Sequence, residues 1–133
     1  MVSRFQLDVK GDSRGSLVAL EYPIVPFEIK RVYYIFGTVA GADRGLHSHK
    51  NLEQVAVCVA GSCRFILDDG TTKMEVVLNS PDQGLYIPKM IWREMDKFSP
   101  NCVVMVLASE TYDESDYIRD YGEFLETTKP LPA

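Results

Sequence analysis

Long apolar runs are absent from this sequence: none of its apolar stretches reaches the roughly 18 residues that a membrane span requires. Residues 1–15 also lack the apolar core of a signal peptide. Cysteines are few, and Cys58, Cys63 and Cys102 show no CxxC spacing. This pattern favours free, buried thiols in a reducing compartment. We therefore expect a cytoplasmic protein that does not enter a membrane.

Positive charge is also scarce. The chain carries 14 Lys and Arg residues against 19 Asp and Glu residues, which gives a net charge of −5. A surface of this sign argues against a nucleic-acid partner, although a locally basic pocket can still bind a small anion. Of the 133 residues, 46% are hydrophobic and 25% are charged, so we expect residues 1–133 to form one globular domain.

Helical patterns are rare, and strand patterns dominate. Seven short runs are rich in β-branched and aromatic residues, and turn signals such as Asp69-Gly70 separate them. The expected strands are 16–22, 30–39, 53–61, 62–69, 73–79, 84–88 and 101–109. Many short strands with tight turns predict an all-β sandwich or barrel. Residues 114–128 alone show apolar side chains at helical spacing, which predicts a short C-terminal helix.

Alternation along two of these runs separates their faces, because successive side chains of a strand point in opposite directions. Arg31 and Tyr33 share one face with Ile35. This pair can serve a ligand, or it can be an exposed arginine beside an ordinary tyrosine. Gln54 shares a face with small residues such as Ala56. That face can line a cavity, or it can pack tightly against a neighbouring sheet.

The chain has only two histidines, and they stand one residue apart in the segment RGLHSHK. In an extended strand, the side chains of His47 and His49 would point into the same space. A pair of this kind can hold a metal, or it can direct two imidazoles at a substrate for proton transfer.

The spacing around the pair resembles the first motif of the cupins, which are small barrels with a double-stranded β-helix or jelly-roll fold. The residues at the positions of that motif are Gly41, His47, His49, Glu53 and Gly61. In cupins this motif typically supplies two histidines and a glutamate to a metal. The resemblance implies a small cupin domain, in agreement with the strand count.

The segment PKMIWR resembles the second cupin motif, P-x-G-x-x-H, but Arg93 stands where the third histidine ligand belongs. A guanidinium is always protonated, cannot donate a lone pair, and would place a positive charge beside a metal. His47, His49 and Glu53 would still suffice for Fe(II) or zinc. Arg93 instead favours a metal-free pocket that binds an anion or a polarised oxygen. We therefore expect neither a metal nor another cofactor.

The segment RGLH resembles the active-site segment of the dTDP-sugar 3,5-epimerases, which are also cupins. In that family the arginine holds the nucleotide diphosphate and the histidine is the catalytic base. The resemblance would give these roles to Arg44 and His47. The segment DSRG resembles the N-terminal D-x-R-G of the same family, which would make Arg14 a second substrate-binding arginine.

A second resemblance covers nearly the whole chain. The matching segments, in order, are RGSLVALE, FEIKRVYYIFG, RGLHSHK, LEQVAVCVAGSC, LDDG, GLYIPKMIWREM, VLAS and YDESDYIRDYGEFL. Together they resemble the dTDP-4-keto-6-deoxyglucose 3,4-ketoisomerases of the FdtA, QdtA and WxcM type. The family's usual histidine segment, R-G-x-H-A-H-K, differs here by Ser48 in place of alanine. This family is metal-independent, and the resemblance favours a homodimer.

The resemblance implies a substrate and a set of roles. The substrate would be a dTDP-linked 6-deoxyhexose with a ketone at C4, and the product would carry the ketone at C3. We expect His47 to be the principal base and His49 its partner, with Tyr33 bonded to the enediolate oxygen. The expected substrate ligands are Arg14, Arg31, Arg44, Gln54 and Arg93. The arginines would supply positive potential for the diphosphate and the oxyanion, and the glutamine would contact sugar or pyrimidine.

Three alternatives stay open. A 3,5-epimerase would act on the same substrate, although those enzymes usually carry a different residue at the position of His49. A metal-dependent cupin, such as a dioxygenase, would use both histidines as ligands. A non-catalytic module would bind the sugar nucleotide without converting it.

Overall fold

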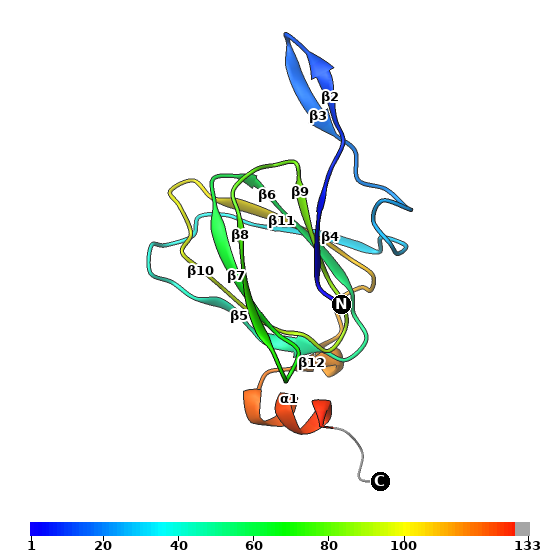
Figure 1. Cartoon of the computed structure of the whole chain (residues 1–133), viewed down its shortest axis with the longest axis vertical. Coiled ribbons are helices and arrows are strands. Elements are labelled where there is room, and N and C mark those ends of the chain that lie inside the picture. Colours follow the sequence, from blue (N-terminus) through cyan, green and yellow to red (C-terminus); the bar gives the residue numbers. More distant parts are fainter. Residues whose placement is uncertain (130–133) are drawn as a thin grey trace.

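The computed structural model describes residues 1–129, which form two five-stranded antiparallel sheets that face each other as a barrel (Figure 1). The first sheet contains, in spatial order, β1 (Ser3–Gln6), β9 (Gln83–Ile87), β6 (Gln54–Ala60), β11 (Val103–Ala108) and β4 (Arg31–Ile35). The second contains β12 (Tyr117–Ile118), β5 (Arg44–His49), β10 (Trp92–Asp96), β7 (Cys63–Asp68) and β8 (Lys73–Leu78).

Two appendages leave the barrel at opposite ends (Figure 1). Strands β2 (Val9–Asp12) and β3 (Gly15–Val18) form a separate hairpin that projects beyond one end. The short 3-10 turn η1 (Glu114–Asp116) and helix α1 (Tyr121–Thr128) lie at the other end. The predicted all-β barrel with a short C-terminal helix is therefore confirmed. Within residues 1–129, neither helical segment has the length and apolar character needed to cross a membrane.

The core fills the space between the two sheets. Strand β6 is buried on both faces, and one of these faces belongs to this core. Ala56 and Cys58 point inward, where they join Phe65 and other apolar residues of the second sheet. Val55 and Val57 point the other way and pack in a second apolar cluster with residues near the N-terminus. Burial on both faces explains why this strand is apolar almost without interruption.

The hairpin between β7 and β8 turns at the predicted Asp69-Gly70 pair. The backbone N–H of Asp69 donates to the carbonyl of Thr72 at 3.2 Å, and Gly70 has a φ of 96°, which a glycine adopts without strain. The strand expected at 16–22 was too long, because β3 ends at Val18. Strands β1, β2, β5, β10 and β12 were not among the seven expected, although an extended conformation at His47 and His49 was considered.

The C-terminal helix is also shorter than residues 114–128, and its predicted first half was wrong. Tyr117 and Ile118 form β12 instead, and they pair with His49 and Ser48 of β5. The helix begins only after Asp120, whose side chain accepts a hydrogen bond from the backbone N–H of Gly122 and so caps it. Pairing with a strand distant in the sequence thus overrides the local helical spacing.

Candidate active site

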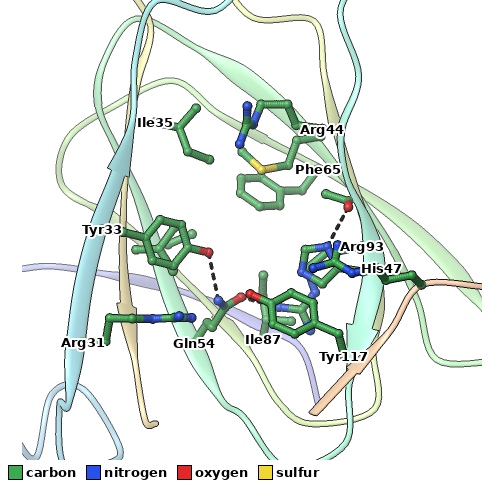
Figure 2. Close-up of a pocket in the computed structure, with 15 residues that line it drawn as sticks. Arg31, Tyr33, Ile35, Arg44, His47, Gln54, Phe65, Ile87, Arg93 and Tyr117 are labelled. Atoms are coloured by element: carbon green, nitrogen blue, oxygen red, sulfur yellow. Dashed lines mark hydrogen bonds between the residues drawn. The ribbon is translucent and has the colours of Figure 1, made fainter. Parts of the chain in front are cut away.

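A cavity of about 340 Å³ lies between the two sheets (Figure 2). Its wall is formed by Arg31, Tyr33, Ile35, Arg44, Gly45, His47, Gln54, Ala56, Phe65, Ile87, Arg93, Met95, Val106, Tyr117 and Arg119. The face of β4 that carries Arg31 and Tyr33 opens onto this cavity, and so does the face of β6 that carries Gln54. The two faces therefore line a cavity; Arg31 and Tyr33 do not lie on an ordinary exposed face, and Gln54 does not lie in a tightly packed one.

A bulge in β5 directs His47 into the cavity. Gly45 pairs with Glu94 and His47 pairs with Arg93, so Leu46 is an extra residue on this strand. Gly45 has a φ of 86°, and a Cβ atom there would lie 3.1 Å from the carbonyl oxygen of Arg93. Both the backbone conformation and the lack of space explain the glycine that precedes the histidines.

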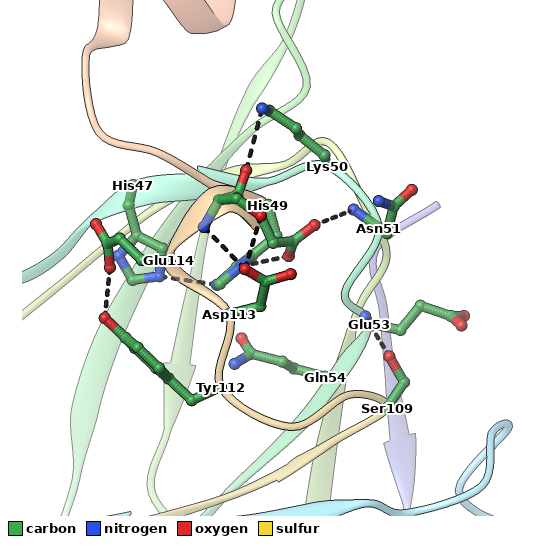
Figure 3. Close-up of polar contacts among 12 residues, drawn as sticks. His47, His49, Lys50, Asn51, Glu53, Gln54, Ser109, Tyr112, Asp113 and Glu114 are labelled. Carbon is green, nitrogen blue, oxygen red and sulfur yellow. Dashed lines mark hydrogen bonds and ion pairs between the residues drawn. The ribbon is translucent and has the colours of Figure 1, made fainter.

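The two histidines do share one space, but only the first lines the cavity. The Nε2 atoms of His47 and His49 lie 3.1 Å apart (Figure 3). His49 is fully buried behind its neighbour, and its Nδ1 lies 3.0 Å from Oδ2 of Asp116. Nδ1 of His47 lies 2.6 Å from the carbonyl oxygen of Gly45. Tyr117 packs on both rings, with centroid distances of 5.0 Å to His47 and 4.3 Å to His49.

Burial and a neighbouring cation keep both imidazoles neutral at physiological pH. Burial lowers the pKa of His47 to about 4, and the positive charge of Arg93 acts in the same direction. Burial and Arg93 also lower the pKa of His49. Neutral imidazoles have a lone pair available, which is the state that a general base requires.

On the opposite wall, a chain of hydrogen bonds fixes the direction of the Tyr33 hydroxyl. Arg93 is buried and donates from a terminal nitrogen to Oε1 of Gln54. The amide nitrogen of Gln54 therefore faces Tyr33 and donates to its Oη at 2.9 Å. Because Tyr33 already accepts this bond, its own O–H is free to donate into the cavity. Burial raises the pKa of Tyr33, so the hydroxyl keeps its proton.

Cationic side chains surround the rest of the cavity. Arg31 and Arg44 line it as expected, and the guanidinium of Arg31 lies 5.2 Å from the ring centroid of Tyr33. The Nε atoms of Arg31 and Arg93 are buried without a hydrogen-bond partner among the described residues. Such donors suit an oxygen-rich anionic ligand.

Of the predicted substrate-binding residues, Arg14 is the one that the chain does not bring to this cavity. It lies on the projecting hairpin at the turn between β2 and β3, where 88% of its side chain is exposed. Its guanidinium binds Asp12 at 2.6 Å. Nothing in a single chain places it near the histidines.

Three residues of the site were missed at the sequence level. Tyr117 was assigned to the helix, although it lies in β12 and contacts both imidazoles. Arg119 lines the cavity and is held by Glu114 through a 2.7 Å ion pair. Asp116 supports His49. In the D-Y-I-R segment, Tyr117 and Arg119 are two positions apart and would share one face of a strand, but this signal is too short to distinguish a strand from a helix.

Glu53 does not join the histidines. Its carboxylate accepts a hydrogen bond from the hydroxyl of Tyr86, and its backbone N–H binds Ser109. Within residues 1–129, the one group of three potential ligands close enough to share an ion is Cys58, Cys63 and Cys102. The site of two histidines and one glutamate considered from the sequence is therefore not assembled.

Comparison with known proteins identifies the family. Residues 2–129 match the family described as FdtA, WxcM-like, C-terminal. The chain belongs to this family. A curated relative, the TDP-4-oxo-6-deoxy-alpha-D-glucose-3,4-oxoisomerase of Aneurinibacillus thermoaerophilus, is 60% identical over 114 residues, which cover 85% of this chain and 82% of that protein. The expected family is confirmed.

Solved structures of 3,4-ketoisomerases share the fold. The WlaRB TDP-quinovose 3,4-ketoisomerase of Campylobacter jejuni is 53% identical, with a TM-score of 0.91 over 94% of this chain and 97% of that one. A mutant of the 3,4-ketoisomerase QdtA of Thermoanaerobacterium thermosaccharolyticum, in complex with TDP-4-keto-6-deoxyglucose, is 41% identical, with a TM-score of 0.93 over 96% and 93% of the two chains. The expected cupin-like ketoisomerase fold is thus confirmed.

Proposed function

We propose that this protein is a nucleotide-sugar 3,4-ketoisomerase, which converts dTDP-4-keto-6-deoxy-D-glucose into a dTDP-3-keto-6-deoxyhexose. The observation that carries the proposal is the opposition of a neutral histidine, His47, and a tyrosine donor, Tyr33, across one cavity. Moving a carbonyl by one carbon requires proton transfers at both carbon and oxygen. His47 on one wall can accept a proton from carbon, and Tyr33 on the other wall can donate to oxygen.

In the first step, His47 accepts the proton from C3 and the C4 carbonyl becomes an enediolate oxygen. The O–H of Tyr33 donates to that oxygen, because its other hydrogen-bonding capacity is used by Gln54. The positive charge of Arg93 stabilises the developing oxyanion across the buried amide. Each positioned acid–base group contributes roughly 10²–10⁴-fold to the rate.

In the second step, the oxygen at C3 loses its proton and C4 gains one, which leaves the ketone at C3. The net change moves one hydrogen from C3 to C4 and one from the C3 oxygen to the C4 oxygen, so no electron acceptor is needed. The histidine pair returns its proton, and Tyr33 exchanges protons with the two oxygens. His49, in contact with His47 at 3.1 Å, shares the proton while the enediol exists.

The arginines at the cavity would bind the diphosphate. Arg44 and Arg119 lie at exposed positions of the wall, while Arg31 is partly buried with a free Nε donor. Charge-assisted bonds to phosphate oxygens are stronger than neutral ones and would orient the sugar toward His47. Gln54 would act mainly through Tyr33 rather than through pyrimidine, because both ends of its amide are engaged.

Carbon NMR of the product after incubation with dTDP-4-keto-6-deoxyglucose tests the proposal. We expect the ketone signal to move from C4 to C3. A ketone that stays at C4, with inversion at C3 or C5, would instead favour a 3,5-epimerase.

A metal-dependent reaction is tested separately. The fixed charge of Arg93 beside both imidazoles supports proton transfer without a metal. We expect full activity after chelation and no stoichiometric metal by elemental analysis. Stoichiometric iron or zinc, with activity lost on chelation, would contradict this part of the proposal.

The variant His47→Asn distinguishes an enzyme from a binding module. We expect it to abolish turnover while dTDP still binds, because the cavity keeps its arginines. Turnover equal to that of the wild type would remove His47 from the mechanism.

We also propose a homodimer in which Arg14 serves the cavity of the partner subunit. Three observations support this arrangement: the hairpin projects from the barrel, β4 has an exposed apolar face, and Arg14 does not line its own cavity. Apolar surface of this kind favours a protein partner. The dTDP-sugar would be the small-molecule partner, and neither a membrane nor a nucleic acid is proposed.

The product has a ketone at C3, which an aminotransferase can convert into a 3-amino-3,6-dideoxy sugar. We propose that the enzyme supplies such a sugar for a surface polysaccharide, lipopolysaccharide or S-layer glycan. Three free, buried cysteines support a location in the reducing cytoplasm.

A further inference from the structure

Each histidine of the pair contacts an acceptor that fixes where its proton sits. Nδ1 of His47 lies 2.6 Å from the carbonyl oxygen of Gly45, and a carbonyl can only accept, so this nitrogen carries a proton. Nδ1 of His49 lies 3.0 Å from Oδ2 of Asp116, and an ionised carboxylate also only accepts. Both rings therefore carry their proton on Nδ1, and the two Nε2 lone pairs face each other.

The Nε2 atoms are 3.1 Å apart, so a hydrogen bond between His47 and His49 requires one further proton. Two lone pairs directed at the same place bind that proton together. Nε2 is also the nitrogen with which His47 can accept a proton, since its Nδ1 is engaged by Gly45. A proton taken from the substrate is thus held between the two rings.

Asp116 is placed to balance the charge of that proton. Its side chain is 11% exposed, beside a His49 side chain that is 1% exposed. Oδ1 of Asp116 accepts the backbone N–H of Asn51 at 2.8 Å, which fixes the carboxylate so that Oδ2 faces the imidazole. Burial and Arg93 oppose a net positive charge on the rings, and the carboxylate offsets the charge when the proton arrives.

Asp116 also forms part of a second hollow, of about 320 Å³. Its other walls include Asp113 and Tyr117, and Tyr117 contributes to the substrate cavity as well. The chain of contacts from His47 through His49 to Asp116 therefore runs from one hollow to the other, with steps of 3.1 Å and 3.0 Å. Both steps are short enough for direct proton transfer.

We infer that Asp116 is a positioning residue that holds His49 as the Nδ1–H tautomer and links the proton stored between His47 and His49 to solvent through the second hollow. The inference rests on the proposed function. The proton that leaves C3 is stored between the rings, and its exchange with water competes with its delivery to C4.

The nearly isosteric variant Asp116→Asn tests this role. An amide that still accepts from Asn51 presents an N–H to Nδ1 of His49, which moves the proton of that ring to Nε2. That proton then occupies the lone pair of His47. We expect kcat to fall on the order of 10²-fold or more, with KM changed by less than about threefold. For the residual turnover in D2O, we expect less solvent deuterium at C4 than in the wild-type product.

The variant Asp113→Asn is the matched control. Asp113 lines the same hollow and caps η1 through its side chain, a function that asparagine retains. It should leave both kcat and the deuterium content unchanged. If the wild type isomerises the substrate and Asp116→Asn matches it in both measurements, the inference is wrong. If the wild type leaves the ketone at C4, the proposed function is wrong instead.

A second measurement needs no substitution. Because the chain has only two histidines, protein labelled with 15N-histidine gives four ring-nitrogen signals, which His47→Asn assigns. We expect His49 to carry its proton on Nδ1 at neutral pH, whether or not any substrate is converted. A proton found on Nε2 of His49, with Nδ1 unprotonated, would overturn the inference independently of the proposed function.

Discussion

Arg93 donates a hydrogen bond to Oε1 of Gln54, and this contact decides which way the amide faces. A guanidinium has donors only, so the oxygen of the amide must point to Arg93 and its nitrogen to Tyr33. Arg93, in the segment that resembles the second cupin motif, therefore orients a hydroxyl on the opposite sheet. Burial lowers the pKa of His47, and the same charge acts in the same direction. One buried cation thus orients the donor and helps to keep the base neutral.

The variant Gln54→Glu reverses the hydrogen bond to Tyr33. A carboxylate pairs with Arg93 but can only accept, so the Tyr33 hydroxyl would donate to it and not to the substrate. We expect kcat to fall by roughly 10²-fold, as for the loss of a positioned acid, with dTDP affinity nearly unchanged. Steady-state kinetics and calorimetric titration with dTDP measure the two effects. A variant with normal kcat would show that the direction of this bond is irrelevant.

The variant Tyr33→Phe removes the hydroxyl while it keeps the ring that Arg31 contacts. Loss of the donor should lower kcat by roughly 10²–10³-fold, because the enediolate oxygen is left without its hydrogen bond. KM should change much less. Thermal unfolding of both proteins is the control for packing. A loss confined to KM would assign Tyr33 to substrate binding alone.

The pH dependence of kcat/KM should have its acidic limb near pH 4, well below the ordinary histidine pKa of about 6.5. Protonation removes the lone pair of His47, so activity is lost as the pH falls through the pKa of the folded state. In Arg93→Met the cation is gone, and the limb should move to higher pH. An acidic limb near pH 6.5 in the wild type would contradict the conclusion that burial and Arg93 lower the pKa of His47.

Stability must be followed over the same range. Unfolded chains protonate these imidazoles near pH 6.5, whereas folded chains resist until about pH 4 for His47. The unfolded state therefore binds more protons in this window, and the free energy of unfolding declines as the pH falls from 6.5 to 4. Circular dichroism at each pH separates this decline from the loss of a catalytic base.

Strand parity made half of the site predictable from sequence. The alternation that places Arg31 beside Tyr33, and Gln54 beside Ala56, depends only on neighbours within one strand. The position of His47 beside His49 has the same local origin. What the sequence could not show is how two sheets bring these faces together, because that depends on pairing between distant segments.

Asp116 and Tyr117 illustrate the limit. They lie 67 positions or more from the histidines they contact, and the pairing of β12 with β5 brings them there. The same residues fit a helical pattern when only their neighbours are considered. Arg14 shows a related limit, because the β2–β3 hairpin that carries it projects away from the barrel, and the sequence of the hairpin does not indicate this direction.

The outer face of β4 is the surface on which a homodimer can be tested. Val32 and Tyr34 of β4 are 53% and 65% exposed, and Phe36, directly after the strand, is 69% exposed. Strand β4 lies at the edge of its sheet. We expect the wild type to be a dimer and Tyr34→Glu to be a monomer, because a buried unpaired carboxylate would destabilise the interface. Light scattering after gel filtration measures both. Val77→Glu, at an exposed position of β8, is the matched control.

Mixing two inactive variants tests whether Arg14 acts in the partner's cavity. Arg14→Ala should lose affinity for dTDP, and His47→Asn should lose turnover. In a heterodimer of the two, the cavity with the intact His47 faces the intact Arg14 of the other subunit. We therefore expect activity to reappear after the mixed variants are dissociated and reassociated.

Activity is recovered only if Arg14 of one subunit reaches the cavity of the other subunit. If Arg14 served its own chain, every cavity in the mixture would lack either the arginine or the histidine, and the mixture would stay inactive. The mixture of His47→Asn with Tyr33→Phe is the control. Both residues line the same cavity of one chain, so it should recover nothing. Activity in that control would mean that His47 and Tyr33 of different subunits can form one active site.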